Sequence, residues 1–319
     1  MTMDWINKCH FGDCVETMRR MPDGIVQTCV TSPPYFGLRD YGHAGQIGLE
    51  PTPAEFVAKL VEVFREVRRV LRDDGTLWLN LGDSYGRGAR VDNVNDGKRG
   101  ATGNTGHVSM TAAKAYGQGG GGRAHQRDKD LLGIPWRVAF ALQEDGWYLR
   151  QDIIWHKPNP MPESVTDRCT KAHEYVFLLS KATRYYFDAM AMQEPAVGGT
   201  PGNKMPTKGR RAYEEGSAEH RTAANLHNIG ARETRNRRSV WTVATKPYKG
   251  AHFATFPPAL IEPCILAGAP PSGVVLDPFF GSGTTGQVAI QHGRQFIGCE
   301  LNSDYEPLQS RRLEQPPLL

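Results

Sequence analysis

The sequence predicts an α/β fold organised around one largely parallel sheet. Short apolar runs with the character of buried strands alternate along the chain with segments that show the 3.6-residue apolar period of helices. Two of the predicted strands end in loops of unusual composition, one rich in proline and the other rich in glycine. Because open parallel sheets bind ligands at the carboxyl ends of their strands, these two loops mark the expected site.

Turns and one helix cap define the elements of the first 180 residues. Thr52 and Glu55 form a capping box around Pro53, and the helix that follows keeps an apolar face until it ends at residues 73–75. The predicted strands are residues 5–8, 25–30, 76–81, 148–155 and 175–179. The predicted helices are residues 14–21, 53–72 and 135–143.

The C-terminal part continues the alternation. Strands are predicted at residues 274–276 and 295–299, and helices at residues 260–266, directly after Gly286, and at residues 302–313. Two polar segments, residues 86–130 and 198–238, interrupt the pattern. Segments of this length without apolar periodicity are functional loops or disordered.

Composition excludes several classes of protein. The 319 residues carry a formal net charge of +4, which alone does not indicate a polyanionic partner. No apolar run reaches the length of a membrane span, and the N-terminus has no signal core. None of the six cysteines belongs to a C-x-x-C pair. We therefore expect a cytoplasmic protein with reduced thiols and without a metal site.

A glycine loop follows the strand at residues 274–276. Gly281, Gly283 and Gly286 have the G-x-G-x-x-G spacing of a loop that lets the backbone approach an adenosine-containing ligand, and Glu300 could accept the ribose hydroxyls. NAD and S-adenosylmethionine both fit this pattern. Asp277 favours S-adenosylmethionine, because a carboxylate there would repel a pyrophosphate.

A second loop, Ser32-Pro33-Pro34-Tyr35, follows the strand at residues 25–30. The amino group of cytosine or adenine is a poor nucleophile, because its lone pair is delocalised into the ring. The Ser32 hydroxyl and the Pro33 carbonyl are acceptors that could hold this nitrogen, and prolines fix the direction of the carbonyl. Tyr35 offers a flat face to a base taken out of the duplex. A plain proline turn is the alternative interpretation of this segment alone.

These motifs resemble those of the beta-class amino-group DNA methyltransferases. Residues 30–35 are similar to the catalytic motif in the form typical of cytosine-N4 enzymes, and residues 277–285 are similar to the cofactor motif. Weaker similarity at residues 154–159, 173–175 and 256–257 extends the resemblance to most of the chain outside the two polar segments. The resemblance implies a Rossmann-like methyltransferase sheet, circularly permuted because the catalytic motif precedes the cofactor motif, with an inserted target-recognition region.

The resemblance also implies domains and partners. Residues 1–195 would form the catalytic half with the polar loop 86–130, residues 196–245 the target-recognition region, and residues 246–319 the cofactor-binding half. The expected cofactor is S-adenosyl-L-methionine and the expected substrate is double-stranded DNA in a bacterial or phage-infected cell. A homodimer and a cognate restriction endonuclease are further expected partners.

Site residues follow from the matched motifs. The predicted catalytic residues are Ser32, Pro33, Pro34 and Tyr35. The predicted cofactor-binding residues are Asp13, Thr31, Phe256, Asp277, Pro278, Phe279, Gly281, Gly283, Thr284, Thr285 and Glu300, where a helix N-cap is an equal interpretation of Asp13. The DNA-binding residues predicted from the matched segments are Trp155, Lys157 and His173. The basic stretch within residues 198–238, which has no match in the family, adds Lys204, Lys208, Arg210, Arg211, Arg235, Arg237 and Arg238 as candidates for contacts with phosphates and guanine edges.

Three other functions stay open at this point. An adenine-N6 methyltransferase would use the same chemistry, although the adenine enzymes of the family more often carry aspartate at the position of Ser32. A nicotinamide-dependent dehydrogenase would use the same glycine loop but would leave Ser32 to Tyr35 without a role. A DNA-binding protein on a methyltransferase scaffold would have no need of intact motifs.

Overall fold

The structure is a computed structural model that describes residues 5–40, 42–43, 45–86, 127–196, 234–245 and 256–314. The chain divides into two compact units. The larger unit comprises Met1–Asp188 and Ser239–Leu319, and the smaller unit is Ala189–Arg238.

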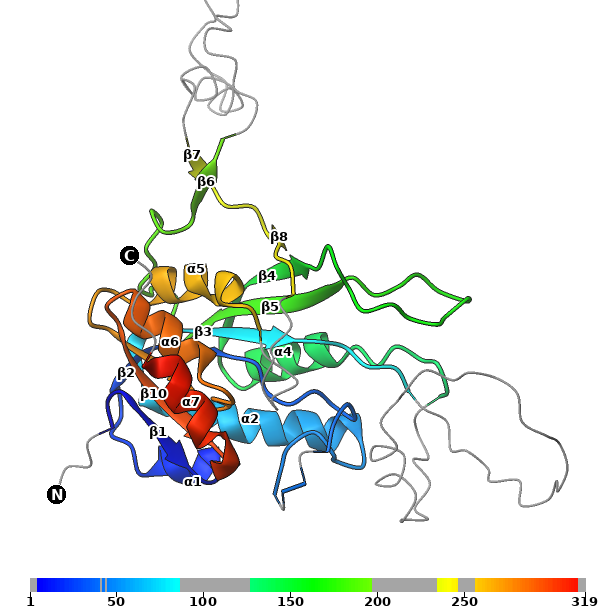
Figure 1. The fold of residues 1–319 in the computed structure, drawn as a ribbon, viewed down its shortest axis with the longest axis horizontal. Coiled ribbons are helices and arrows are strands. Elements are labelled where there is room, and N and C mark those ends of the chain that lie inside the picture. Colours follow the sequence, from blue (N-terminus) through cyan, green and yellow to red (C-terminus); the bar gives the residue numbers. More distant parts are fainter. Residues whose placement is uncertain are drawn as a thin grey trace, which may run out of the picture. The chain divides into compact units, whose positions relative to one another are not determined.

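The larger unit is built on an eight-stranded sheet with the order β1-β10-β9-β2-β3-β5-β4-β8 (Figure 1). The strands are β1 (Lys8–Phe11), β2 (Val26–Thr31), β3 (Leu71–Leu81), β4 (Tyr148–His156), β5 (His173–Ser180), β8 (Val240–Thr242), β9 (Val274–Asp277) and β10 (Gln295–Glu300). Strands from β1 to β3 in this order are parallel, whereas β5 is antiparallel to both β3 and β4. The prediction of a largely parallel α/β sheet is confirmed.

Helices cover both faces of this sheet. They are α1 (Cys14–Arg19), α2 (Pro53–Val70), α4 (Ile134–Glu144), α5 (Pro258–Gly268), α6 (Thr284–Gln291) and α7 (Glu306–Leu313). Leu77, Leu79 and Leu81 of β3 join the main apolar cluster with α1, α2 and α4. The intervening Trp78 lies on the face that α5 covers, because strand side chains alternate between faces. Burial of each of these leucine side chains stabilises the folded state by about 1.5–3 kcal/mol.

Several predicted boundaries differ from the structure, and two of them have a clear local reason. The first strand starts at Lys8 rather than residue 5, since Asn7 has a left-handed backbone with φ of 55°. The capping box at Thr52 forms, but α2 ends at Val70 rather than near residue 73. Leu71 is already extended and is paired with Val26 in the sheet.

The permuted topology is visible in the pairing of β1. Lys8 lies opposite Ile297 in parallel register, so β1 occupies the sheet position that a strand following α7 would take. β9, α6, β10, α7 and β1 thus continue one alternation of strands and helices, although β1 comes first in the chain. This arrangement confirms the circular permutation.

The smaller unit contains the antiparallel pair β6 (Gln193–Pro195) and β7 (Thr234–Asn236). Its limits, residues 189–238, differ from the predicted target-recognition region at residues 196–245. The difference arises because β6 pairs with β7, whereas β8 pairs with β4 in the main sheet. Most of the two polar segments, residues 87–126 and 197–233, lies outside the described residues. Among the described residues, no helix has the length and apolar character to cross a membrane.

Candidate active site

The two predicted motifs meet at the carboxyl ends of neighbouring strands. β2 and β9 pair in parallel, with Thr28 opposite Val275. At the end of β2 the Thr31 hydroxyl donates a hydrogen bond of 2.6 Å to Asp277 Oδ1 at the end of β9. Ser32 is therefore one residue away from a direct contact with the glycine loop, although 246 positions separate Thr31 from Asp277.

Asp277 holds the start of the glycine loop. Its side chain is buried, and besides Thr31 it accepts hydrogen bonds from the Thr285 hydroxyl at 2.7 Å and from the Phe279 backbone amide at 3.0 Å. Burial raises the pKa of Asp277 to about 6, although these three hydrogen bonds act in the opposite direction. The carboxylate therefore joins the catalytic segment, the loop and the first turn of α6.

The glycine loop has a backbone shape that depends on glycine. Gly281 and Gly283 have φ of 52° and 86°, which side chains rarely adopt. A Cβ on Gly283 would lie 3.4 Å from the Phe280 ring, so the left-handed backbone rather than a lack of space disfavours a side chain there. The Gln309 side chain of α7 donates to the Gly281 carbonyl at 2.8 Å and fixes the loop from outside.

Glu300 lies at the end of β10 and faces the same loop. Its Oε2 accepts from the Gly281 amide at 2.7 Å, and its Oε1 accepts from the Asn302 amide at 2.8 Å. Burial raises the pKa of Glu300, and these backbone hydrogen bonds oppose the rise. Each oxygen keeps a further lone pair for a hydroxyl donor. A carboxylate fixed in this position could accept hydrogen bonds from the ribose hydroxyls of S-adenosylmethionine. The neighbouring glycine loop would let the protein backbone approach the same cofactor.

Three other residues predicted to bind the cofactor lie at or just before the N-terminal ends of helices. Asp13 is the N-cap of α1 and accepts from the Glu16 amide at 2.9 Å, which realises the alternative interpretation of this residue. The adjacent Gly12 amide donates to the Glu300 carbonyl at 2.8 Å, so Asp13 lies close to the end of β10. Phe256 precedes α5 and is partly buried. Thr284 begins α6 and is hydrogen-bonded to Arg312.

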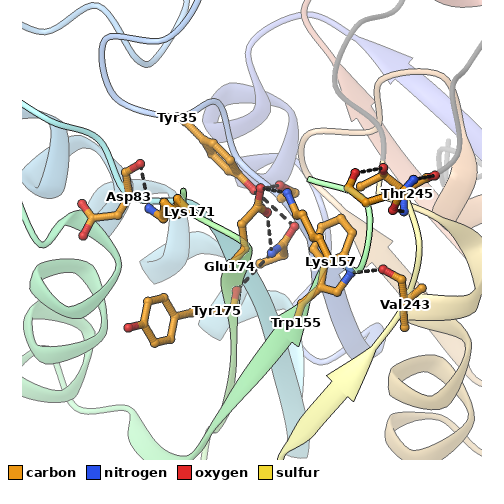
Figure 2. A network of polar contacts seen from close by, with 12 residues as sticks. Tyr35, Asp83, Trp155, Lys157, Lys171, Glu174, Tyr175, Val243 and Thr245 are labelled. Carbon is orange, nitrogen blue, oxygen red and sulfur yellow. Dashed lines mark hydrogen bonds and ion pairs between the residues drawn. The ribbon is translucent and has the colours of Figure 1, made fainter. Parts of the chain in front are cut away.

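Tyr35 of the predicted catalytic segment belongs to a polar network, shown in Figure 2. The Ser32 hydroxyl lies 3.4 Å from the Tyr35 hydroxyl, which donates to Glu174 Oε2 at 2.6 Å and lies 3.3 Å from Asn80 Oδ1. Lys157 forms an ion pair with Glu174 Oε1. The network joins the end of β2 to β3, β4 and β5.

Two predicted DNA contacts have other partners in this network. Trp155 is only 3% exposed, and its indole nitrogen donates to the Val243 carbonyl at 2.8 Å. Lys157 lies over the Trp155 ring at 4.3 Å and is paired with Glu174. Trp155 thus packs inside the fold and Lys157 belongs to the network around Tyr35, and the contacts of both residues with DNA stay predictions.

The other predicted DNA contacts are only partly described. His173 begins β5 and is half-buried, and burial together with Lys171 lowers its pKa. In the smaller unit Arg235 and Arg238 both donate to Glu194, at 2.9 and 2.8 Å. Arg237 lies between them, and its backbone amide donates to the Met192 carbonyl. Lys204, Lys208, Arg210 and Arg211 lie outside the described residues.

Sequence reasoning missed two members of the network. Asn80 donates to Glu174 Oε2 at 3.2 Å and to the Tyr175 carbonyl at 3.0 Å. The signal for Glu174 was its place between His173 and Tyr175, in a segment that resembles the family's base pocket. Asn80 could have been found as a polar residue within an otherwise apolar strand, where a buried amide needs partners.

Comparison with known proteins supports the assignment of the motifs to one family. A family model described as DNA methylase matches residues 26–310. The type II methyltransferase M.XycI of Xanthomonas campestris pv. cyanopsidis is 47% identical over 303 residues, which cover 95% of this chain and 86% of the relative. These matches decide against a dehydrogenase that would use the same glycine loop.

Solved structures agree on the fold. The PvuII DNA methyltransferase (cytosine-N4-specific) aligns with a TM-score of 0.62 at 18% identity and covers 98% of this chain and 88% of its own. A chain from Thermus thermophilus, described as a DNA modification methylase, aligns with a TM-score of 0.57 at 22% identity, covering 96% and 92%. It was solved with S-adenosylmethionine, the cofactor of these enzymes. From its motifs, its sheet and its relatives, the chain belongs to the N6/N4 DNA methylase family.

Proposed function

We propose that this chain is a site-specific methyltransferase that modifies the N4 amino group of cytosine in duplex DNA after base flipping. The observation that carries the proposal is the hydrogen bond between Thr31 and Asp277, which joins the Ser-Pro-Pro-Tyr segment to the cofactor loop. Serine rather than aspartate at position 32 favours cytosine over adenine. Adenine-N6 methylation by the same mechanism is the alternative.

The proposed chemistry uses acceptors on the protein to activate a weak nucleophile. The Ser32 hydroxyl and the Pro33 carbonyl accept hydrogen bonds from the amino group, so the nitrogen lone pair is drawn away from the ring and becomes available. Tyr35 holds the flipped base by stacking. S-adenosylmethionine, when bound, supplies the electrophilic methyl group. Asp277 and Glu300 shape the loop that holds this cofactor beside Ser32.

The proposed biological role follows from the relatives. Three relatives that are 46–47% identical to this chain are named type II methyltransferases, the modification enzymes of restriction–modification systems. We infer that this chain protects a specific DNA site from a cognate endonuclease. Residues 196–245, whose predicted cations include Arg237, are the proposed target-recognition region.

The test is mass spectrometry of nucleosides. Purified protein is incubated with unmodified genomic DNA and S-adenosylmethionine, the DNA is digested, and methylated nucleosides are quantified beside a Ser32→Ala variant. N4-methylcytosine that is absent with Ser32→Ala supports the proposal. N6-methyladenine would keep the mechanism and overturn the choice of base. Absence of both products, with cofactor binding intact by equilibrium titration, would indicate a DNA-binding protein without this activity.

A further inference from the structure

Glu174 lies behind the catalytic segment in a position that the proposed chemistry does not yet use. Its carboxylate is 15% exposed and faces the Tyr35 hydroxyl at 2.6 Å, a shorter contact than those of the hydroxyl with Ser32 and Asn80 (Figure 2). A hydrogen bond to a carboxylate is stronger than one between neutral groups. Glu174 is therefore the main anchor of the far end of the Tyr35 side chain.

The carboxylate itself is fixed from two further sides. Lys157, 18% exposed, forms an ion pair with Oε1, and the Asn80 amide donates to Oε2 at 3.2 Å. Asn80 is in turn held by the Tyr175 carbonyl at 3.0 Å. A partly buried carboxylate with a charged partner and hydrogen bonds on both oxygens is restricted in its orientation.

The Tyr35 ring is confined along its edge as well. A Cβ placed on Gly82 would lie 2.5 Å from Tyr35 Cε2, so the ring packs against bare backbone at the end of β3. With the hydroxyl fixed by Glu174 and the edge fixed by Gly82, the plane of the ring is set before any base arrives. Pre-set geometry matters because the stacked base must present its amino group to Ser32.

The direction of the hydrogen bonds adds a second consequence. A carboxylate cannot donate, so the single hydrogen of the Tyr35 hydroxyl points to Glu174. The Tyr35 oxygen then presents lone pairs towards the Ser32 hydroxyl, 3.4 Å away. When Ser32 donates to Tyr35, its own lone pairs remain for an amino group.

We propose that Glu174 is a positioning residue for methyl transfer, which acts through the Tyr35 hydroxyl to set the stacking plane of the target base and the acceptor role of Ser32. This inference rests on the proposed function. It predicts that Glu174 matters for kcat rather than for cofactor affinity, because the cofactor loop belongs to Asp277 and Glu300. It also predicts that the effect of Glu174 requires the Tyr35 hydroxyl.

The experiment is a double-mutant cycle of Glu174→Ala and Tyr35→Phe, in which phenylalanine keeps the ring and removes the hydroxyl. Each protein is assayed for kcat and for the KM of DNA, and its S-adenosylmethionine Kd is measured by titration. We expect Glu174→Ala to lower kcat by about tenfold to a hundredfold with cofactor Kd within about twofold. In the Tyr35→Phe background the same substitution is expected to change kcat by less than about twofold.

Glu66→Ala is the matched control, because Glu66 of α2 is 20% exposed and is paired with Arg69 at 2.9 Å, away from the network. It is expected to leave kcat unchanged. If Glu174→Ala loses cofactor binding through misfolding, Glu174→Gln replaces it in the same cycle.

The outcomes separate the two proposals. An equal loss of kcat in both backgrounds, or no loss in either, would overturn the role of Glu174 while methylation by the parent chain upheld the function. No methylated nucleoside from the parent chain would overturn both.

Discussion

The buried side chain of Asp277 organises the site but destabilises the folded protein when it is charged. It is buried among Thr31, Thr285 and the Phe279 amide, and it joins the end of β2 to the loop after β9. Burial disfavours its charged form, so the folded pKa, about 6, lies above the ordinary value of 3.8. This carboxylate therefore organises the site at a cost in stability when it is ionised.

The pH dependence of stability should reveal that cost. Because the folded pKa is raised, the folded state binds the proton more tightly, and the contribution of Asp277 to stability is lost as pH rises from about 4 to above 6. The shift corresponds to roughly 3 kcal/mol. In urea unfolding, Asp277→Asn is expected to gain in stability relative to the parent by up to this amount between about pH 4 and about pH 7. A difference that stays constant across this range would contradict the assignment.

Gly82 supplies a second test at the same scale. A methyl group at this position would meet the Tyr35 ring at 2.5 Å and would have to displace it. Gly82→Ala is expected to lower kcat by about tenfold or more while the cofactor Kd stays within about twofold. Steady-state kinetics and titration measure the two quantities. Unchanged kcat would show that the ring tolerates displacement.

At the scale of single residues, the sequence predicted which residues belong to the site better than it predicted which of them are in contact. Ser32, Tyr35, Asp277 and Glu300 were identified because their motifs have fixed spacing. The partnership of Tyr35 with Glu174 spans 139 positions and depends on the register of the antiparallel pair β3–β5, in which Leu81 lies opposite Tyr175. Local pattern carries no information on that register.

Helix α5 shows how an element is fitted to the sheet. Its last residue, Gly268, is buried against β2 and β3, where a Cβ would lie 2.6 Å from the Thr28 hydroxyl oxygen and 2.9 Å from the Trp78 indole nitrogen. Thr28 is already hydrogen-bonded to the Thr76 carbonyl at 3.1 Å. Close approach of the helix therefore depends on the absence of a side chain.

Gly268→Ala is expected to destabilise the protein by about 1–3 kcal/mol, because a methyl group would force the helix away from the sheet. Chemical denaturation measures the change in the free energy of unfolding. Glu262→Ala on the same helix is the control, since the Glu262 side chain is 46% exposed. Equal effects of the two substitutions would contradict the packing argument.

Element prediction succeeded where apolar periodicity was long and failed where strands were short. The face of α2 and the strands β2, β9 and β10 were recognised from their composition. β6, β7 and β8 each have three residues, too few to show an alternating pattern. β8 joins the sheet by pairing with Ile154, Trp155 and His156 of β4. The sequence around β8 contains no pattern that predicts this pairing.

The whole larger unit is a sheet whose order in space differs from its order in the chain. The cofactor strands β9 and β10 lie between β1 and β2, so the N-terminal and C-terminal parts of the chain interleave in one layer (Figure 1). The motif order predicted this permutation, because both motifs require strand ends of the same sheet edge. The strands of the smaller unit could not be predicted in the same way, since they are short and are not followed by a ligand motif.

Reversing the permutation tests this description of the whole unit. A chain that begins at residue 250, runs to residue 319, and continues through a flexible glycine–serine linker into residues 1–249 has the cofactor motif first. We expect its S-adenosylmethionine Kd to stay within about threefold of the parent, because the sheet neighbours are unchanged. The parent carrying the same linker at its C-terminus is the control. A folded permutant without cofactor binding would contradict the prediction.

The pairing of Lys8 with Ile297 has a consequence for the timing of synthesis. On the ribosome, β1 and β2 emerge long before β9 and β10, the strands that must lie between them. Until residues 274–300 have been translated, β1 lacks its neighbour β10 and β2 can pair only with β3, so each of them presents an unpaired edge. Such late, long-range pairing makes folding slow. We therefore expect affinity for S-adenosylmethionine to appear only when these strands have joined the sheet, so that a product truncated before residue 274 binds no cofactor in an equilibrium titration.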